Sequence, residues 1–256
     1  MMENKSNIKS IVKAGKIIDV IAYERIPISL SDLSKRLDMA KSTLHGLLST
    51  LVDIGYLEQV QESGKYKLGV QLFELGSQIM NTWSEKEIAQ PYMEELARRT
   101  SETVHLAMLS NGEVLYVDKK EGNSSIRIVT APGVKLPAHC TGVGKTLLAF
   151  LPEEKWKDIL DTVGLQKYTS YTITKEEMLY KELDKIRRQG YAYDNQEYLD
   201  GLRCISAPIF DNNGRLVFAL SISGPLSRMS KANIQAYLGL LLDATKDISK
   251  KLGYRG

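Results

Sequence analysis

The sequence predicts an α+β protein in two parts: a small helical unit that ends in a β-hairpin, and a larger domain built on an antiparallel sheet. Apolar residues recur at helical spacing in the first segments of the chain, and an alternating pattern broken by a turn follows at 55–69. Further on, a helical block at 142–190 separates two groups of strand-like segments. Strand pairs on either side of a helical block are typical of an α+β domain.

The first predicted helix covers residues 8–23. Its apolar side chains recur at helical spacing, and Pro27 ends the segment soon afterwards. These apolar positions are Ile8, Ile11, Val12, Ile17, Ile18 and Ile21. We expect this helix to brace the two helices that follow.

Residues 29–50 predict two short helices joined by a tight turn at Asp38-Met39. Ser29 and Asp32 resemble a capping box, because the hydroxyl can accept a free backbone N–H and the carboxylate favours the positive end of a helix. The apolar face of the first of these helices consists of Leu30, Leu33 and Leu37.

The second helix of the pair has one apolar and one polar face. The apolar positions are Leu44, Leu47, Leu48, Leu51 and Ile54. The polar face begins with Lys41, Ser42 and Thr43 and continues to His45. Such side chains reach phosphates and base edges when the start of a helix enters a major groove. The sequence therefore predicts a helix-turn-helix with these four residues at double-stranded DNA.

Residues 55–69 alternate, turn at residues 62–65 and alternate again, which predicts a hairpin. A hairpin directly after a helix-turn-helix is a wing, and Lys65 at its tip is predicted to contact the sugar-phosphate backbone. The alternative is a solvated hairpin tip with no partner.

A helix with a broad apolar stripe is predicted over residues 70–83. Two interpretations stay open here, a helix that pairs with its copy in a dimer and a simple core helix. Dimerisation gains support because one winged helix covers little DNA, and two half-sites raise the affinity.

The rest of the chain alternates between helical and strand-like segments. A helix is predicted over 85–100, followed by strands at 104–109, 113–119 and 126–131. Asn111-Gly112 separates the first two strands and is a strong hairpin signal. Further helices are predicted at 144–151, 151–160, 175–190 and 230–253, and further strands at 191–198, 202–210 and 216–224.

Composition excludes several classes of protein. The formal net charge is +3 over 256 residues, which permits DNA binding without demonstrating it. Two cysteines cannot form a disulfide framework and fit no zinc-ligand spacing, so no metal or cofactor is expected. Charged residues interrupt the N-terminal apolar run, and no apolar stretch approaches the ~18 residues that span a bilayer. We therefore expect a cytoplasmic protein with no membrane partner.

Several long motifs, in a fixed order, resemble one family of regulators. They are KSTLHGLLSTL, GYLEQVQESGKYKLG, LPAHCTGVGKTLLAFLP, GYAYDNQEYLDGLRCISAPIFDNNGRL and FALSISGP. Together they make the chain similar to transcriptional regulators of the isocitrate-lyase-regulator (IclR) type from about Lys9 to Gly253.

The resemblance implies a winged helix-turn-helix at 1–69, a linker helix at 70–84 and a GAF-like effector-binding domain at 85–256. It also implies a homodimer or tetramer on a DNA operator, mostly with repressor action. Two residues depart from the family pattern. Asp38 replaces the usual turn glycine, and aspartate tolerates the left-handed backbone at small cost. Gly46 replaces a frequent arginine, so one DNA contact is lost, and a glycine inside a helix costs about 1 kcal/mol against alanine.

Gly144-Lys145-Thr146 invites comparison with a phosphate-binding P-loop. The motif requires a glycine five residues before Gly144, but His139 stands there, so we reject ATP or GTP as ligands. Residues 141–144 are predicted to open a helix, and the free N–H groups at a helix start attract a carboxylate.

The resemblance implies that this helix start belongs to a pocket for a small organic acid. The matching positions are Ile128, Leu136, Gly142, Val143, Asp194, Cys204, Ser221 and Ser223. The residues agree in part, since Ser221 and Ser223 face the same side of a strand and can donate to an anion. A keto acid, a sugar acid or an aromatic acid would suit such a pocket. Each residue also has a simple structural explanation, such as a buried cysteine or a turn aspartate.

Two other classes of function have weaker support in the residues. A small-acid enzyme would need a nucleophile beside a base, and the adjacent pair His139-Cys140 is poorly placed for that role. A thiol- or metal-responsive regulator would depend on Cys140 and Cys204, which make a weak ligand set. The sequence favours a ligand-controlled DNA-binding regulator with no catalytic residues.

Overall fold

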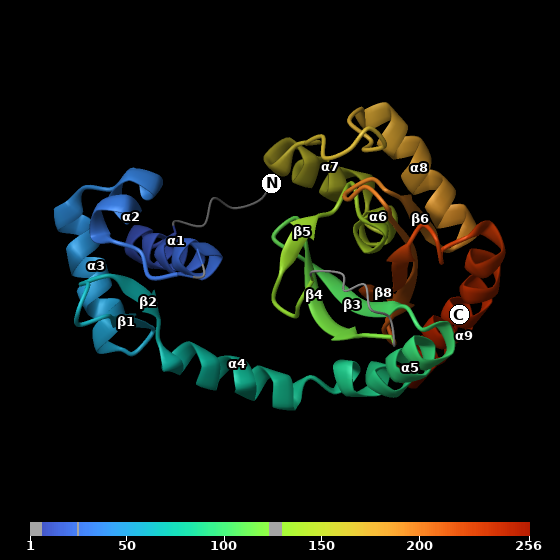
Figure 1. Cartoon of the computed structure of the whole chain (residues 1–256), viewed down its shortest axis with the longest axis horizontal. Coiled ribbons are helices and arrows are strands. Elements are labelled where there is room, and N and C mark those ends of the chain that lie inside the picture. The colour runs from blue at the N-terminus through green and yellow to red at the C-terminus, as the bar shows by residue number, and fades with distance from the viewer. Residues whose placement is uncertain (1–6, 25, 123–129) are drawn as a thin grey trace. The chain divides into compact units, whose positions relative to one another are not determined.

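The computed structural model describes residues 7–24, 26–122 and 130–256, without the side chains of residues 80–82. The chain divides into two compact units between Trp83 and Ser84 (Figure 1). The strand predicted over 126–131 falls mostly outside these described residues. Its last two residues, Thr130 and Ala131, belong to no strand.

The N-terminal unit packs three helices and a hairpin around one small core. The helices α1 (Lys9–Glu24), α2 (Leu30–Leu37) and α3 (Lys41–Asp53) lie close to their predicted ranges. Six of the side chains predicted to face inward are buried in this core: Ile17, Ile21, Leu33, Leu44, Leu48 and Leu51. Four others on the predicted apolar faces are exposed instead: Ile8, Ile11, Val12 and Ile54. The 3.6-residue period therefore identified the buried faces of α2 and α3, but in α1 only the second half of the predicted face is buried.

The predicted caps of α2 are present. The Ser29 hydroxyl accepts a hydrogen bond from the Asp32 N–H at 3.1 Å and donates to the Asp32 carboxylate at 2.6 Å. Asp38 ends the helix in the left-handed conformation, with φ 48° and ψ 48°. The turn thus keeps the geometry that glycine would supply, which confirms that aspartate is tolerated there.

The wing is a two-stranded antiparallel hairpin of β1 (Leu57–Gln59) and β2 (Tyr66–Leu68). Gly64 takes a positive φ of 64° in its turn. Tyr66 is buried in the core and pairs with Ile28, so the hairpin is fixed to the segment before α2. Helix α4 (Val70–Thr82) follows and leaves Phe73 and Ile79 exposed, at 74% and 59%.

The C-terminal unit is built on one six-stranded antiparallel sheet. Its strands are β3 (Thr103–Ser110), β4 (Glu113–Lys120), β5 (Lys135–Pro137), β6 (Ala192–Asn195), β7 (Leu202–Phe210) and β8 (Leu216–Pro225), in the order β5-β4-β3-β8-β7-β6. The short strand β5 was not predicted. Its three residues pair with β4, and a segment of that length carries no alternation that a sequence reading could detect.

Helices cover both faces of this curved sheet. Helix α6 (Gly142–Ala149) lies within the curve, and α5 (Ser84–Thr100) and α9 (Lys231–Lys251) lie on the outer side (Figure 1). The remaining helices, α7 (Glu153–Val163) and α8 (Glu176–Gln189), belong to the same core as α6. Helix α6 begins at Gly142, two residues before its predicted start. It packs against strands β7 and β8 of the sheet. None of the described helices is long and apolar enough to cross a bilayer.

Candidate functional site

The exposed face of α3 carries the four residues predicted to meet DNA. Lys41, Ser42, Thr43 and His45 are all exposed, while Leu44 on the opposite side is fully buried. The helix start is therefore held by its apolar face and presents polar side chains outward. This is the arrangement that a recognition helix needs to enter a major groove.

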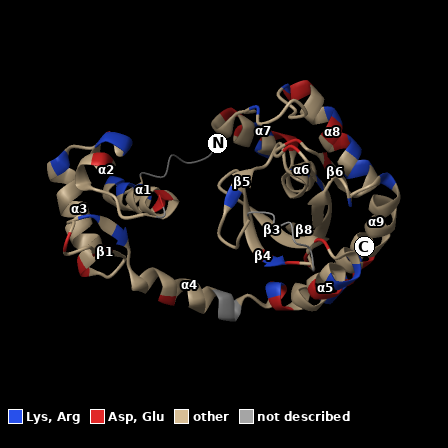
Figure 2. Ribbon diagram, viewed as in Figure 1, with Lys and Arg blue, Asp and Glu red and all other residues tan. Residues whose placement is uncertain are grey.

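Two neighbouring positions complete this surface. Lys65 is exposed at the hairpin turn, and Gly46 is exposed on α3, where an added methyl group would meet no atom within 4 Å. Basic and acidic residues are interspersed along the chain of the N-terminal unit (Figure 2). The charge of this unit alone does not define a nucleic-acid interface, as the composition already indicated.

The C-terminal unit contains a cavity of about 460 Å³ at the start of α6. Six predicted pocket residues line it: Leu136, Gly142, Val143, Asp194, Cys204 and Ser223. Ser221 is buried beside them and its hydroxyl hydrogen-bonds the Cys204 thiol without lining the cavity. Ile128 lies outside the described residues. A cavity of this size suits a small ligand.

The other residues that line the cavity were not predicted as pocket residues, although Thr141 was predicted at the helix start. They are His105, Tyr116, Thr130, Thr141, Tyr198, Leu199, Asp200, Gly201, Leu202 and Pro225. His105 enters the site because β3 pairs with β8, which places it opposite Ser221. That pairing joins strands more than a hundred residues apart, so only the predicted position of His105 on a strand gave any signal.

The start of α6 is fixed by close contacts. The Thr141 hydroxyl caps the helix by accepting the Gly144 N–H at 3.2 Å and donates to the Pro137 carbonyl at 3.0 Å. A methyl group on Gly144 would lie 2.2 Å from the Ala138 carbonyl oxygen. Only glycine fits there, because that distance is far below van der Waals contact. The glycine of the GKT sequence thus serves packing rather than phosphate binding.

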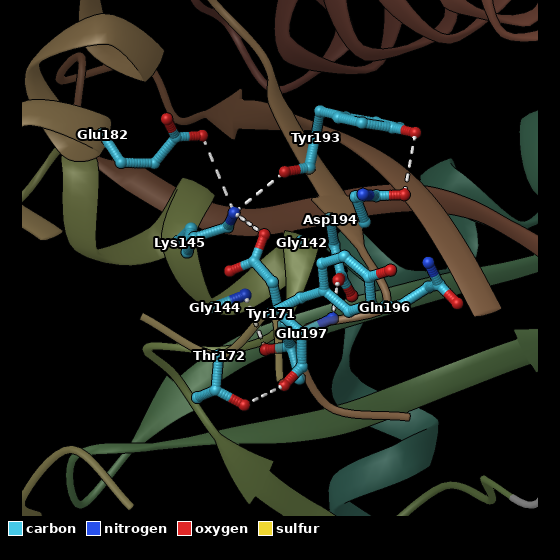
Figure 3. A network of polar contacts seen from close by, with 12 residues as sticks. Gly142, Gly144, Lys145, Tyr171, Thr172, Glu182, Tyr193, Asp194, Gln196 and Glu197 are labelled. Carbon is cyan, nitrogen blue, oxygen red and sulfur yellow. Dashed lines mark hydrogen bonds and ion pairs between the residues drawn. The ribbon is translucent and has the colours of Figure 1, made fainter. Parts of the chain in front are cut away.

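Lys145 is almost fully buried. It stands at the centre of a network of polar contacts (Figure 3). Its Nζ donates to the Tyr193 carbonyl at 2.8 Å and to the Glu197 carboxylate at 2.5 Å, and Glu182 Oε1 of α8 is 3.6 Å away. Because its charge is matched inside the protein, Lys145 cannot act as the phosphate-binding lysine of a P-loop. The rejection of ATP and GTP therefore agrees with the geometry.

Asp194 lies where this buried network meets the cavity. Its carboxylate accepts the Gly142 N–H and, at 2.9 Å, the Glu197 N–H. Burial raises its pKa to about 7, and the nearby Glu197 carboxylate adds to this rise, although Lys145 opposes it. Burial also raises the pKa of Glu197. Near neutral pH, Asp194 is therefore divided between its charged and neutral forms.

The loop after β6 forms the outer side of the cavity. We call residues 198–202 the cavity loop; its tip, Leu199 and Asp200, is exposed. The residues before it are held in place, because the Thr172 hydroxyl donates to the Glu197 carbonyl at 2.6 Å (Figure 3). The Thr169 hydroxyl likewise donates to the Gln196 carbonyl at 2.7 Å.

The histidines and cysteines of this unit lack the features of catalytic groups. His105 Nε2 lies 2.7 Å from the Thr130 hydroxyl, and burial together with Lys119 lowers the pKa of His105 to about 3. Burial raises the pKa of Cys204 to about 12 and that of Cys140 above its usual range. The thiols are therefore protonated and weakly nucleophilic. His139 Nε2 lies 2.9 Å from the Gln166 carbonyl oxygen rather than beside a nucleophile.

The described part of the chain contains no candidate metal-binding site. Across residues 7–24, 26–122 and 130–256, no group of three or more His, Cys, Asp or Glu side chains is arranged to hold an ion. Neither cysteine has a second thiol partner there, and both are buried.

Two family models match the chain. The IclR helix-turn-helix domain matches residues 10–61, and the bacterial transcriptional regulator IclR C-terminal domain matches residues 81–250. Over 248 residues the chain is 38% identical to the HTH-type transcriptional regulator KdgR of Escherichia coli K12, which covers 97% of this chain and 94% of that protein. It is 32% identical to the transcriptional repressor IclR of the same organism, over 96% of this chain and 90% of the relative.

A solved structure has the same architecture. It is an IclR homolog from Microbacterium hydrocarbonoxydans in complex with 4-hydroxybenzoate, with a TM-score of 0.77 and 26% identity over 95% of this chain and 98% of that one. The two Escherichia coli relatives are named as a regulator and a repressor rather than enzymes, and the matching regions span both units described above. The chain belongs to the IclR family of bacterial transcriptional regulators.

Proposed function

We propose that this protein is a repressor that binds a specific DNA operator and whose affinity for that operator is controlled by a small organic acid. The observation that carries the proposal is the exposed polar start of α3, whose opposite face is fully buried. Lys41, Ser42, Thr43 and His45 would read the major groove, and Lys65 would contact the backbone from the wing. The relative named as a transcriptional repressor supports the direction of regulation.

A dimer or tetramer is part of the proposal. Four large apolar side chains of α4 are exposed, Val70, Phe73, Leu75 and Ile79, and exposed apolar side chains in such number indicate an interaction surface. One winged helix-turn-helix contacts only a short half-site, and two linked copies would bind a two-fold symmetric operator far more tightly. Pairing of α4 with its copy would cover these side chains and fix the spacing of the two recognition helices.

The acid would bind in the cavity of the C-terminal unit. The Val143 N–H lies in the first turn of α6 and meets no acceptor in the described part of the chain, so it is free to donate to a carboxylate. Gly142 lets a ligand approach the backbone, Ser223 supplies a hydroxyl, and Leu136 supplies an apolar wall. The 4-hydroxybenzoate complex of the Microbacterium relative supports a carboxylate as the ligand class.

The proposal is tested by selecting operator sequences from a random pool of double-stranded DNA with the full-length protein. Fluorescence anisotropy then measures the affinity for the selected duplex and for a shuffled duplex of equal composition. We expect the selected duplex to bind at least about a hundredfold more tightly than the shuffled one. A panel of keto, sugar and aromatic acids should contain a member that weakens this binding.

Two results would contradict the proposal. Equal affinity for both duplexes would exclude sequence-specific recognition. Specific binding that no acid in the panel alters, and no member of the panel that raises the melting temperature of the protein, would exclude the effector assignment.

A further inference from the structure

Resting on the proposed function, we propose that the cavity binds its acid effector together with one proton, which Asp194 holds and donates to the carboxylate of the ligand. A proton on Asp194 would offset the negative charge that the acid brings into the cavity.

No basic side chain in the described part of the chain lines the cavity. Its charged lining residues are Asp194 and Asp200, and His105 is neutral because burial keeps its pKa low. A bound carboxylate would therefore meet carboxylates and neutral groups rather than a cation. Binding an anion in such a site costs free energy unless one of the charges is removed.

The buried cation nearest to Asp194 is already paired. Lys145 of α6 bonds the Glu197 carboxylate at 2.5 Å and the Tyr193 carbonyl at 2.8 Å, and it faces Glu182 of α8. One buried lysine thus stands against two buried carboxylates, Asp194 and Glu197, before any ligand arrives. A ligand carboxylate adds a third negative charge, and uptake of a proton restores the balance.

The other titratable groups around Asp194 do not supply a positive charge. Cys204 of β7, Cys140 before α6 and Tyr116 of β4 are held in their neutral forms, because burial raises the pKa of each. Tyr198 of the cavity loop lines the same cavity. The nearest arginine on the neighbouring strand, Arg203, donates to the Asn195 side chain and to the Met229 carbonyl instead.

Asp194 is placed to carry the proton. It lines the cavity, is buried, and accepts two backbone N–H groups from Gly142 and Glu197 that fix its orientation. Its pKa of about 7 means that protonation near neutral pH costs little. A protonated carboxyl donates one O–H and can form a short hydrogen bond to a ligand carboxylate. The proton comes from solvent, and no covalent bond is made or broken.

The experiment is calorimetry on the full-length protein with pyruvate, gluconate and 4-hydroxybenzoate. The tightest binder is titrated between about pH 6 and about pH 8.5, in pairs of buffers that differ in ionisation enthalpy. These acids stay ionised over this range. We expect affinity to be level below about pH 6.5 and to fall about tenfold for each pH unit well above about pH 7. Proton uptake should rise from near zero to close to one over the same range.

Two variants locate the proton. Asp194→Asn keeps an acceptor for the backbone N–H groups and an N–H donor for the ligand, so it should bind the acid with the same affinity at every pH. Asp200→Asn removes the exposed carboxylate of the cavity loop and should keep the pH dependence of the unaltered protein. The primary amide of the same acid, which is neutral, should bind without proton uptake.

The outcomes separate this inference from the proposed function. If no acid binds at any pH, both fall. If an acid binds with level affinity and no proton uptake, the inference is wrong and the effector assignment stands. A pH dependence that survives in Asp194→Asn would place the proton elsewhere and would also overturn it. The buffer pairs show whether binding takes up a proton in the unaltered protein, so level affinity without uptake would overturn the inference even if the variant does not fold.

Discussion

A methyl group on the Cα of Gly142 would lie 2.8 Å from the sulfur of Cys204. The first turn of α6 and strand β7 therefore touch at the inner wall of the cavity, and neither can shift without the other. We expect Gly142→Ala to displace Cys204 into the space for the effector and to weaken effector binding at least about tenfold, with a stability loss of about 1–3 kcal/mol.

A matched control for Gly142→Ala is Gly239→Ala in α9, where a methyl group would meet nothing within 4 Å. It should leave effector binding unchanged. The measurement is calorimetric titration of the acid, beside operator affinity by anisotropy. Unaltered effector binding in Gly142→Ala would show that this wall of the cavity does not contact the effector.

Lys41→Ala tests the recognition helix. Lys41 is exposed at the first position of α3, where one phosphate contact is expected. Loss of that contact should weaken operator binding and reduce the slope of log affinity against log salt by about one. Lys231 is likewise exposed at the first position of α9, and Lys231→Ala should change neither quantity. Equal slopes for the two variants would place α3 away from DNA.

Gly46→Ala should stabilise the N-terminal unit. The position is exposed inside α3, and a methyl group there would meet no atom within 4 Å. Replacing glycine with alanine in a helix should raise the free energy of unfolding by about 1 kcal/mol. Gly69→Ala provides the opposite case, because its methyl group would lie 2.2 Å from the Gly55 carbonyl oxygen. Urea denaturation of both variants checks the predicted signs.

Lys145→Met should destabilise the C-terminal unit strongly. The substitution keeps much of the side-chain volume but leaves Glu197 buried without its partner, which costs about 3–5 kcal/mol. Adding Glu197→Gln to this variant should recover a large part of the loss, because the uncompensated charge is then gone. Denaturant midpoints measure both. A Lys145→Met protein as stable as the parent would mean that this ion pair is not formed.

Asp194 also predicts how stability depends on pH. Its pKa is raised from 3.8 to about 7 in the folded protein, so between these values the folded state holds more proton than the unfolded state. The free energy of unfolding should therefore fall by up to about 1.4 kcal/mol per pH unit as pH rises from about 4 to about 7. Glu197 acts in the same direction and His105 in the opposite one.

The difference between the parent and Asp194→Asn isolates this contribution. The variant should gain stability relative to the parent as pH rises, and the gain should level off above about pH 7. Parallel stability curves for the two proteins would show that Asp194 titrates normally in the fold.

Local patterns in the sequence were sufficient to predict the helices, caps and hairpin of the N-terminal unit. Leu33 and Leu44 follow the helical period, and Ser29 and Asp38 are caps whose chemistry is contained within a few neighbouring residues. The start of α6 could also be predicted from the sequence, because Thr141 and the glycines after it are typical of a helix start. These features depend on contacts close in the chain.

The remainder of the cavity depends on contacts between distant residues. His105 reaches it only through the pairing of β3 with β8, and Lys145 finds Glu197 only because α6 crosses the end of β6. No spacing rule connects such positions. The resemblance to a family supplied Asp194 and Cys204, but the pairing of Lys145, and with it the lack of a free cation at the described cavity lining, became visible only in three dimensions.

The inner wall of the cavity is tightly packed, whereas the tip of the cavity loop is exposed, and this difference should determine where related regulators diverge in sequence. Any side chain at Gly142 would meet both Cys204 and Asp194, so a larger residue there requires compensation at those positions. The tip of the cavity loop is exposed, and Thr169 and Thr172 hold only the residues before it. We expect new ligand preferences to arise by substitution in this loop, while the inner wall keeps the chemistry that recognises an acid.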